Sequence, residues 1–369
     1  MFLKDIFSRI AFVLMLLALP NSLFANKSLV ESPKTEFNVN EMIMHHVKDA
    51  HEWHLWGPEH GGVSIYLPVI LYDNGFKIFN SKNLYHGNYK VEKADSNESF
   101  SYVEGIGSAK GYAMCHEKIY KLDNNKLHFK EGHPHNAKPL DLSITKNVCS
   151  LFIGAILILL IMFTMAKYYR KNGAVAPKGI AKFLEPLVLL VQDDIAKANI
   201  GEKKYKKFVP FLLTAFFFIL LNNLLGMIPI FPGGANLTGN ISVTFFLALC
   251  TLLITLFSGN KNYWRHIFAT PGVPIPILII MVPIEIVGIF TKPIALMIRL
   301  FANITAGHII ILALISLVFI NKNIAWGALS VPLSLFISIL EVLVAFLQAY
   351  LFTMLSALFI GAAVEDAHH

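Results

Sequence analysis

Arg299 is a permanently charged residue inside an apolar run, Pro293 to Ile311, that is long enough to lie in a lipid bilayer. A guanidinium does not lose its proton, so placing it in hydrocarbon costs about 2.5–3.5 kcal/mol on insertion scales. Residues of this kind usually face a protein partner, a water-filled cavity or an ion path. The chemistry to expect around Arg299 is therefore charge recognition or ion movement inside a membrane.

Further polar side chains interrupt the last two apolar stretches, and their spacing groups them by helix face. Arg299 and Asn303 are four residues apart and share a face, and Glu341 and Gln348, seven residues apart, share another. His308 follows Arg299 by nine residues, which is about half a turn out of phase and roughly 13 Å along a helix axis. That separation does not suit an ion pair, so Arg299 and His308 are expected to occupy different sides or depths of one helix.

A registry argument relates the two stretches to each other. If they fold back on each other about residue 324, His308 lies sixteen residues before the turn and Glu341 seventeen after it. Arg299 then lies twenty-five residues before the turn and Gln348 twenty-four after it. An antiparallel pair therefore sets His308 level with Glu341, and Arg299 level with Gln348. A histidine and a carboxylate can exchange protons, which suggests a proton station; the alternative is an ion pair that only fastens two helices.

Arg299 has no evident carboxylate partner on these two stretches, because no acid is both level with it and on its face. We expect its partner on another chain. Glu285 is fourteen residues earlier, on roughly the same face but about 21 Å away. It fits the lining of a separate aqueous entrance or a position near the cytoplasmic interface. Lys292 is expected to snorkel to the membrane surface.

Composition defines the class of protein that carries these residues. Of 369 residues, 55% are hydrophobic and only 15% charged, which lies outside the range of soluble domains. We expect an all-α polytopic membrane protein with about five membrane helices, the last two long and tilted as an antiparallel hairpin, and a small extracytoplasmic N-terminal domain. The formal charge of +7 does not indicate nucleic-acid binding, because the lysines gather beside apolar spans, as orientation signals do.

The predicted membrane domain covers residues 144–363, followed by a polar C-terminal tail, 364–369. An apolar run of about 46 residues exceeds the bilayer thickness more than twofold as one helix, so it must be tilted, broken or divided. Lysines after the first span indicate that this side of the membrane is the cytoplasm. If residues 275–320 cross the membrane once rather than twice, the C-terminus is also in the cytoplasm. The stretch 180–200 predicts an amphipathic helix on the membrane surface or against a partner. The predicted spans are 144–166, 208–231, 241–258, 275–320 and 326–363.

The N-terminal part contains two predicted segments. Residues 1–25 have the pattern of a signal peptide, with an uncleaved membrane anchor as the alternative. Residues 26–143 are predicted to form an extracytoplasmic domain with some β structure, including a hairpin that turns at Asp73-Asn74-Gly75. The histidines of this part suggest either a zinc or copper site or, as we prefer without a clean ligand spacing, an aromatic-rich interfacial helix over 41–56. The histidines concerned are His45, His46, His51, His54 and His60. We therefore predict no metal and no cofactor.

Residues 293–311, PIALMIRLFANITAGHIII, resemble the signature of the membrane subunit a of F-type ATP synthases. In that signature an R-L-F-x-N core is followed by A-G and an acid or a histidine. The segments EVLVAFLQAYLFTMLSALFIG (341–361), LNNLLGMIPIF (221–231) and TGNISVT (238–244) are also similar to that family. The resemblance covers about residues 144–363, and most of 57–140 looks like an insertion.

The resemblance implies a mechanism and partners. Arg299 would face a ring of c subunits, meet each c-subunit carboxylate as the rotor turns, and separate two aqueous half-channels. The residues of the proton path would be Arg299, Asn303, His308, Glu341, Gln348 and Glu285. In some members of the family the acid follows A-G and the histidine lies on the last helix; here the two types are exchanged.

The implied protein is a non-catalytic subunit in the bacterial inner membrane, with the ATP chemistry on other chains and H⁺ or Na⁺ as the ion. Its partners would be the c-subunit ring, b-type peripheral stalk subunits, other ATP synthase subunits and the lipid bilayer. One alternative is a stand-alone secondary transporter or proton channel in which Arg299 binds an anion, although no internal repeat or pair of short broken helices supports it. Another is a membrane metalloenzyme that uses the histidine-rich segment.

Overall fold

The computed structural model describes most of the chain from residue 43 onward. The described residues are 43, 47–56, 62–93, 99–130, 133–173, 175, 179–228, 233–269, 274–321 and 323–365. The predicted signal peptide, His45, His46, His60 and the last residues of the C-terminal tail lie outside this set.

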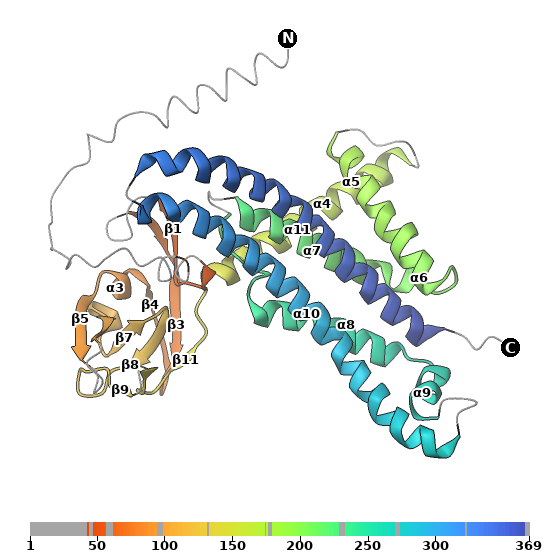
Figure 1. Ribbon diagram of the computed structural model, residues 1–369, viewed down its shortest axis with the longest axis horizontal. Coiled ribbons are helices and arrows are strands. Elements are labelled where there is room, and N and C mark those ends of the chain that lie inside the picture. Colours follow the sequence, from red (N-terminus) through yellow and green to blue (C-terminus); the bar gives the residue numbers. More distant parts are fainter. Residues whose placement is uncertain are drawn as a thin grey trace, which may run out of the picture. The chain divides into compact units, whose positions relative to one another are not determined.

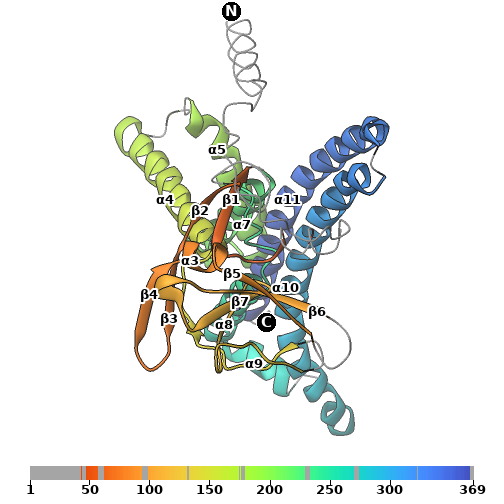
Figure 2. The same ribbon diagram turned by 90° about the vertical axis from the view of Figure 1, so that its left-hand side faces the viewer.

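The described residues before the first long helix form a β domain of small antiparallel sheets (Figures 1 and 2). The sheets have the strand orders β1-β2, β11-β3-β4, β5-β6-β7-β8 and β10-β9. The strands are β1 (Glu52–Trp56), β2 (Val63–Tyr66), β3 (Pro68–Tyr72), β4 (Phe76–Asn80), β5 (Asn88–Lys93), β6 (Ser99–Glu104), β7 (Tyr112–Cys115), β8 (Lys118–Lys121), β9 (Phe129–Lys130), β10 (His133–Pro134) and β11 (Leu140–Asp141). A short helix, α3 (Lys82–Tyr85), and a 3₁₀ turn, η1 (Gly107–Ala109), connect them.

The predicted hairpin is confirmed. β3 and β4 pair antiparallel with Tyr72 opposite Phe76, and residues 73–75 form the turn. Asn74 and Gly75 both have positive φ, 52° and 139°, which is why a turn with asparagine and glycine suits this place. Inward residues of the hairpin, Val69, Leu71 and Phe79, pack into one core with Tyr112 and Leu84.

The predicted helix over 41–56 is wrong in its second half. Ile43 and Val47 are helical, but Glu52–Trp56 is strand β1, which pairs with β2. The aromatic and apolar side chains of EWHLW suit a pleated surface as well as a helix face. The sequence beyond the Gly61-Gly62 break supplies the partner strand, and that pairing decides the structure.

The second half of the chain contains five helices that are long and apolar enough to cross a membrane, within the described residues. Two of them, α8 and α10, begin and end at the predicted residues, and the long run of 46 residues is one continuous helix although Pro283 and Pro293 lie inside it. The others differ from prediction by a few residues at their ends. The five helices are α4 (Lys146–Asn172), α7 (Val209–Met227), α8 (Ile241–Ser258), α10 (Ile275–Ile320) and α11 (Gly327–Val364).

Shorter helical segments connect these five. The predicted amphipathic stretch is helical, as α5 (Ile180–Leu189), a π-helical segment η2 (Leu190–Lys197) and α6 (Ala198–Ile200). The 3₁₀ turn η3 (Tyr205–Lys207) precedes α7, helix α9 (Lys261–Phe268) lies between α8 and α10, and the 3₁₀ turn η4 (Ile324–Trp326) joins α10 to α11. Buried side chains of α4, η2, α7, α10 and α11 form the main helical core.

Helices α10 and α11 lie side by side (Figures 1 and 2). Near the connecting turn, the Ser330 hydroxyl of α11 donates a hydrogen bond to the Leu314 carbonyl of α10. Two registered helices hold their polar residues at fixed relative depths, which is what a site inside apolar helices requires.

Gly361 is the point at which α11 approaches α6 most tightly. A Cβ atom on Gly361 would lie 2.0 Å from the Asn199 carbonyl oxygen, which is backbone and cannot rotate away. We expect Gly361→Ala to destabilise the protein by about 1–3 kcal/mol, the usual cost of overpacking. The measurement is the thermal unfolding temperature of the detergent-solubilised protein, with Ala362→Ser at the exposed neighbouring position as the control. An unchanged unfolding temperature for Gly361→Ala would contradict the packing.

Candidate functional site

His308 and Glu341 come together between α10 and α11. The Nδ1 atom of His308 lies 3.6 Å from Oε1 of Glu341, an ion-pair distance that is longer than a hydrogen bond. Their side chains are 18% and 4% exposed. The two titratable groups that the sequence placed at one level are therefore in contact, and they are largely shielded from solvent.

One glycine makes room for this pair, and a second lies next to it. A Cβ atom on Gly307 would lie 2.8 Å from Oε1 of Glu341, so a side chain there would push the carboxylate away. A Cβ atom on Gly226 of α7 would lie 3.7 Å from Nε2 of His308. Gly307 is the glycine of the A-G-H triplet that the sequence comparison with the family already included. Its contact with the Glu341 carboxylate, which leaves no space for a side chain, is seen only in the structure.

Arg299 and Asn303 are exposed on α10, whereas the residues that directly follow them, Leu300 and Ile304, are buried. Among the residues that the structure describes, none forms a hydrogen bond or an ion pair with the Arg299 guanidinium. Apolar residues of the same helix, such as Ile298, which is 51% exposed, are also exposed near Arg299 in the chain. The arrangement is a permanent charge presented outward from an apolar helix face.

The remaining predicted site residues are more dispersed. Gln348 of α11 is buried, but within the described residues no hydrogen bond joins it to Arg299. Glu285 is half-buried near the start of α10 and has no ion-pair partner in the described part of the chain. Lys292 is exposed, and its ammonium lies 5.8 Å from the centre of the Phe359 ring. The structure thus joins His308 to Glu341 but does not join the other members into one contact network.

Polar groups of α7 lie in the same buried region. Asn223 accepts a hydrogen bond of 2.5 Å from the Thr238 hydroxyl and donates one of 3.5 Å to the Ala345 carbonyl of α11. Asn223 therefore links α7 to α11. Asn222 instead donates to the Phe218 carbonyl of its own helix.

Of the five histidines singled out in the sequence, the two described ones, His51 and His54, have protein partners. His51 Nε2 lies 3.0 Å from Asp141 Oδ2, and His54 Nδ1 lies 3.1 Å from the Ser64 hydroxyl. Within the described residues, no three histidine, cysteine or acidic side chains lie close enough together to hold a metal ion. His45, His46 and His60 fall outside that set.

The fold and the site define a class: a multi-pass helical membrane protein with a titratable pair and an outward-facing arginine inside its apolar helices. Residues 148–361 match the family model described as ATP synthase A chain, and residues 42–142 match a domain of unknown function (DUF8433). The chain therefore belongs to the ATP synthase A chain family.

Curated relatives agree with this assignment. The chain is 51% identical over 261 residues to ATP synthase subunit a 2 of Chlorobaculum tepidum, a match that covers 67% of this chain and 72% of the relative. It is 47% identical over 236 residues to ATP synthase subunit a of Myxococcus xanthus, covering 62% and 76%. It is 41% identical over 318 residues to ATP synthase subunit a 2 of Prosthecochloris aestuarii, covering 83% and 93%. The last match extends beyond the membrane helices into the N-terminal part.

Proposed function

We propose that this chain is the proton-translocating stator subunit of a rotary ATP synthase, in which Arg299 separates two aqueous half-channels that serve the carboxylates of a c-subunit ring. The family and the names of the relatives support the assignment of this chain as a subunit of the membrane sector. The ATP chemistry then belongs to other chains.

The observation that supports the proposed role of Arg299 is the outward position of its side chain. A cation exposed among apolar side chains, without an ion-pair partner in the described residues, has an unbalanced charge. Such a charge is stabilised when an acid of another chain meets it. Arginine never releases its proton, so it can attract a deprotonated rotor carboxylate while blocking a direct proton passage beside itself.

His308 and Glu341 are proposed to deliver protons to the rotor carboxylate from the outer side. Imidazole and carboxylate both exchange protons readily, and the two groups are 3.6 Å apart in a shielded place. Asn303 and Gln348 are proposed to line the same half-channel by hydrogen bonding, and Glu285 the inner one. The exchange of acid and histidine relative to other family members keeps one group of each type at the station.

The proposed topology follows the lysine distribution. The segment between α4 and α7 is lysine-rich and lies in the cytoplasm, which puts the β domain outside and the C-terminus of α11 in the cytoplasm. The proposed partners are the c-subunit ring, at the face of Arg299, and b-type peripheral stalk subunits.

The test is ATP-driven proton pumping by membranes that carry the assembled complex, with ATP hydrolysis measured alongside, in the parent and in Arg299→Ala. Loss of pumping supports the proposal, and unimpaired coupled pumping overturns it. Retained uptake of an anionic solute in place of pumping would favour the stand-alone transporter.

A further inference from the structure

The first turn of α4 is tied to the β domain. The Thr145 hydroxyl accepts a hydrogen bond from the Val148 amide and caps the helix, at 3.4 Å. The amide of Asn147 donates to the Asp49 carboxylate at 3.0 Å, and the amide of Lys146 donates to the Ala50 carbonyl at 2.8 Å. These bonds satisfy amides that a helix start leaves without intrahelical partners.

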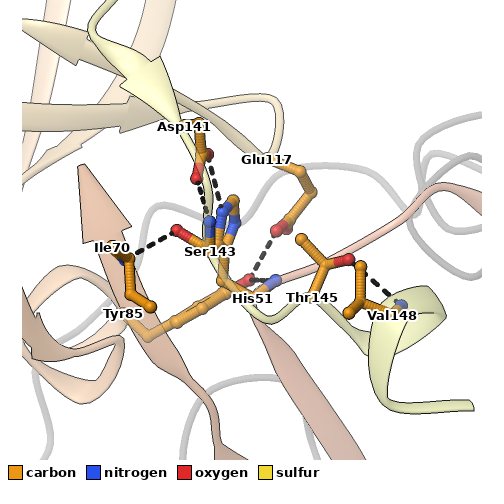
Figure 3. Close-up of polar contacts among 8 residues, drawn as sticks. All are labelled: His51, Ile70, Tyr85, Glu117, Asp141, Ser143, Thr145 and Val148. Atoms are coloured by element: carbon orange, nitrogen blue, oxygen red, sulfur yellow. Dashed lines mark hydrogen bonds and ion pairs between the residues drawn. The ribbon is translucent and has the colours of Figure 1, made fainter. Parts of the chain in front are cut away.

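Bonds within the domain fix the strand that leads into α4 (Figure 3). Asp141 of β11 accepts from His51 and from the Ser143 amide, and the Ser143 hydroxyl accepts from the Ile70 amide at 3.0 Å. Burial acts against the ionised form of Asp141, but the bonds from His51 and Ser143 outweigh it and lower the pKa of this carboxyl. The junction between the β domain and α4 is therefore a defined structure.

Lys146 is buried at this junction, only 8% exposed. A lysine is almost never buried without charged partners. Its ammonium lies within electrostatic reach of three carboxylates of the β domain, those of Asp49, Glu117 and Glu52. Asp49 and Glu117 are half-buried, whereas Glu52 is buried, so this junction cluster of Asp49, Glu52, Glu117 and Lys146 runs from a partly solvated edge inward.

Hydrogen bonds orient one of these acids. The Tyr85 hydroxyl donates to Oε2 of Glu117 at 2.5 Å, and the same hydroxyl accepts from the His51 amide at 3.3 Å (Figure 3). Burial, followed by the Glu117 charge, raises the pKa of Tyr85, so the phenol stays protonated and keeps donating. Glu117 is thus held at the junction.

Lys146 couples the junction cluster electrostatically to the candidate proton station. Lys146 lies within electrostatic reach of His308 as well as of the three acids. The β domain also contacts the segment after α7, where the Trp53 indole donates to the Gly233 carbonyl at 3.0 Å. Two residues further on, the Ala235 carbonyl lies beside Gly226, whose other neighbour is His308. The β domain therefore contacts the segment that packs against Gly226, which is itself a neighbour of His308.

Two buried atoms along this route lack a hydrogen-bond partner in the described part of the chain. They are Oδ1 of Asn147, next to Lys146, and Oε1 of Glu341, next to His308, in residues that are each 5% exposed. Buried polar atoms of this kind are usually satisfied by ordered water. Water between the two would connect the junction cluster with the His308–Glu341 pair.

We propose that the junction cluster is the outer mouth of the ion path, so that the N-terminal β domain takes part in proton entry. The acids attract protons to the mouth, and the buried Lys146 balances their charge and marks the passage towards His308. The inference rests on the proposed function of the membrane helices and adds a role for residues that precede them.

A first test removes one acid of the mouth and reads the dependence of ATP synthesis on outer pH in reconstituted vesicles. Glu117→Gln keeps an acceptor for Tyr85 but removes a charge that concentrates protons, so the half-maximal rate should move to lower outer pH. The groups facing Lys146 in that measurement are Asp49, Glu52, Glu117 and His308. The control is Glu104→Gln, a domain carboxylate that pairs with Lys90 at 2.6 Å, and it should leave the profile unchanged. A loss of rate that is equal at all pH values would mean a structural role and would overturn the proposal.

A second test asks whether the mouth carries ions. Glu117→Cys is introduced with Cys149→Ser and Cys250→Ser, and a small membrane-impermeant cationic thiol reagent is added outside. Cys115 can stay, because burial raises the pKa of its thiol to about 11 and keeps it unreactive near neutral pH. Modification of the cysteine introduced at position 117 should reduce proton-driven ATP synthesis about tenfold. Charges that line a cleft change the local concentration and the arrival rate of ions by about this factor or more. Lys118→Cys, exposed beside it, should show little effect.

The outcomes separate this inference from the proposed function. If Arg299→Ala blocks pumping but neither change at Glu117 alters proton flow or its pH profile, only the inference fails. If Arg299→Ala leaves pumping intact, the proposed function itself fails.

Discussion

Replacing Arg299 with alanine should reduce ATP-driven proton pumping about 100-fold or more in the assembled complex. Removing one partner of a buried ion pair usually costs about 3–5 kcal/mol, which corresponds to about two to four powers of ten in an equilibrium. The proposed partner of Arg299 is the rotor carboxylate, which we propose gives up its proton beside the guanidinium. ATP hydrolysis, measured in the same membranes, should fall less than pumping, because we propose that its chemistry lies on other chains.

Lys292 provides the matched control for Arg299. It is another cation on α10, also exposed, and its only charge-related contact in the described residues is with the Phe359 ring at 5.8 Å. Lys292→Ala should change pumping less than about twofold, because a side chain that snorkels to an interface contributes little to a path. Equal losses in Arg299→Ala and Lys292→Ala would indicate that any charge on α10 is needed for folding.

A conservative change at Arg299 tests whether any positive charge is sufficient or whether the charge must be one that cannot be lost by deprotonation. Arg299→Lys keeps a cation but replaces the rigid, always protonated guanidinium with an amine that can lose its proton when desolvated. We expect much less than the parent activity and a raised passive proton leak through the complex. Full activity in Arg299→Lys would contradict the proposed barrier between two half-channels. A residue that exchanges protons would let them pass from one half-channel to the other.

Apolar run lengths and local turn residues were sufficient to predict much of the fold. The bounds of α8 and α10 follow from long, mainly apolar stretches that proline, glycine or asparagine delimit at each end. The β3–β4 hairpin follows from the turn at Asn74-Gly75. Strand β1 was wrongly assigned to a helix because its pairing with β2 is a contact that short-range periodicity does not contain.

Sequence reasoning could predict contacts in the candidate site only between residues of one helix, or between two helices joined by a short turn. Residue counting about the turn near 324 placed His308 at the level of Glu341, and the structure brings them to 3.6 Å. Lys146 was missed, because its burial and its carboxylate neighbours depend on how the β domain packs against the start of α4. In the sequence it stands as one lysine before an apolar run, which is the common pattern of a membrane boundary.

Exchanging the two members of the buried pair should restore much of what either single change removes. His308→Glu leaves two carboxyl groups facing each other, and Glu341→His leaves two imidazoles, so each single variant puts like charges at 3.6 Å or forces one group to stay neutral. We expect each to lower proton-driven ATP synthesis about tenfold. The double variant, which has one group of each kind again, should return to within about threefold of the parent. The coupling in this double-mutant cycle would then be about 2 kcal/mol, in the range found for residues in contact.

The pair His308→Gln with Glu341→Gln decides between a proton station and a helix fastener. Two glutamines can hydrogen-bond across the same gap and hold α10 against α11, but neither can take up and release a proton near neutral pH. A station therefore predicts that this double variant assembles with an unfolding temperature close to that of the parent and conducts protons about tenfold or more slowly. Glu341→Gln alone should slow proton flow less than Arg299→Ala, because water and His308 remain to carry protons. Near-parental proton flow in the double glutamine variant would instead show that the two residues only fasten the helices, and the path to the rotor would then have to run past another part of α10.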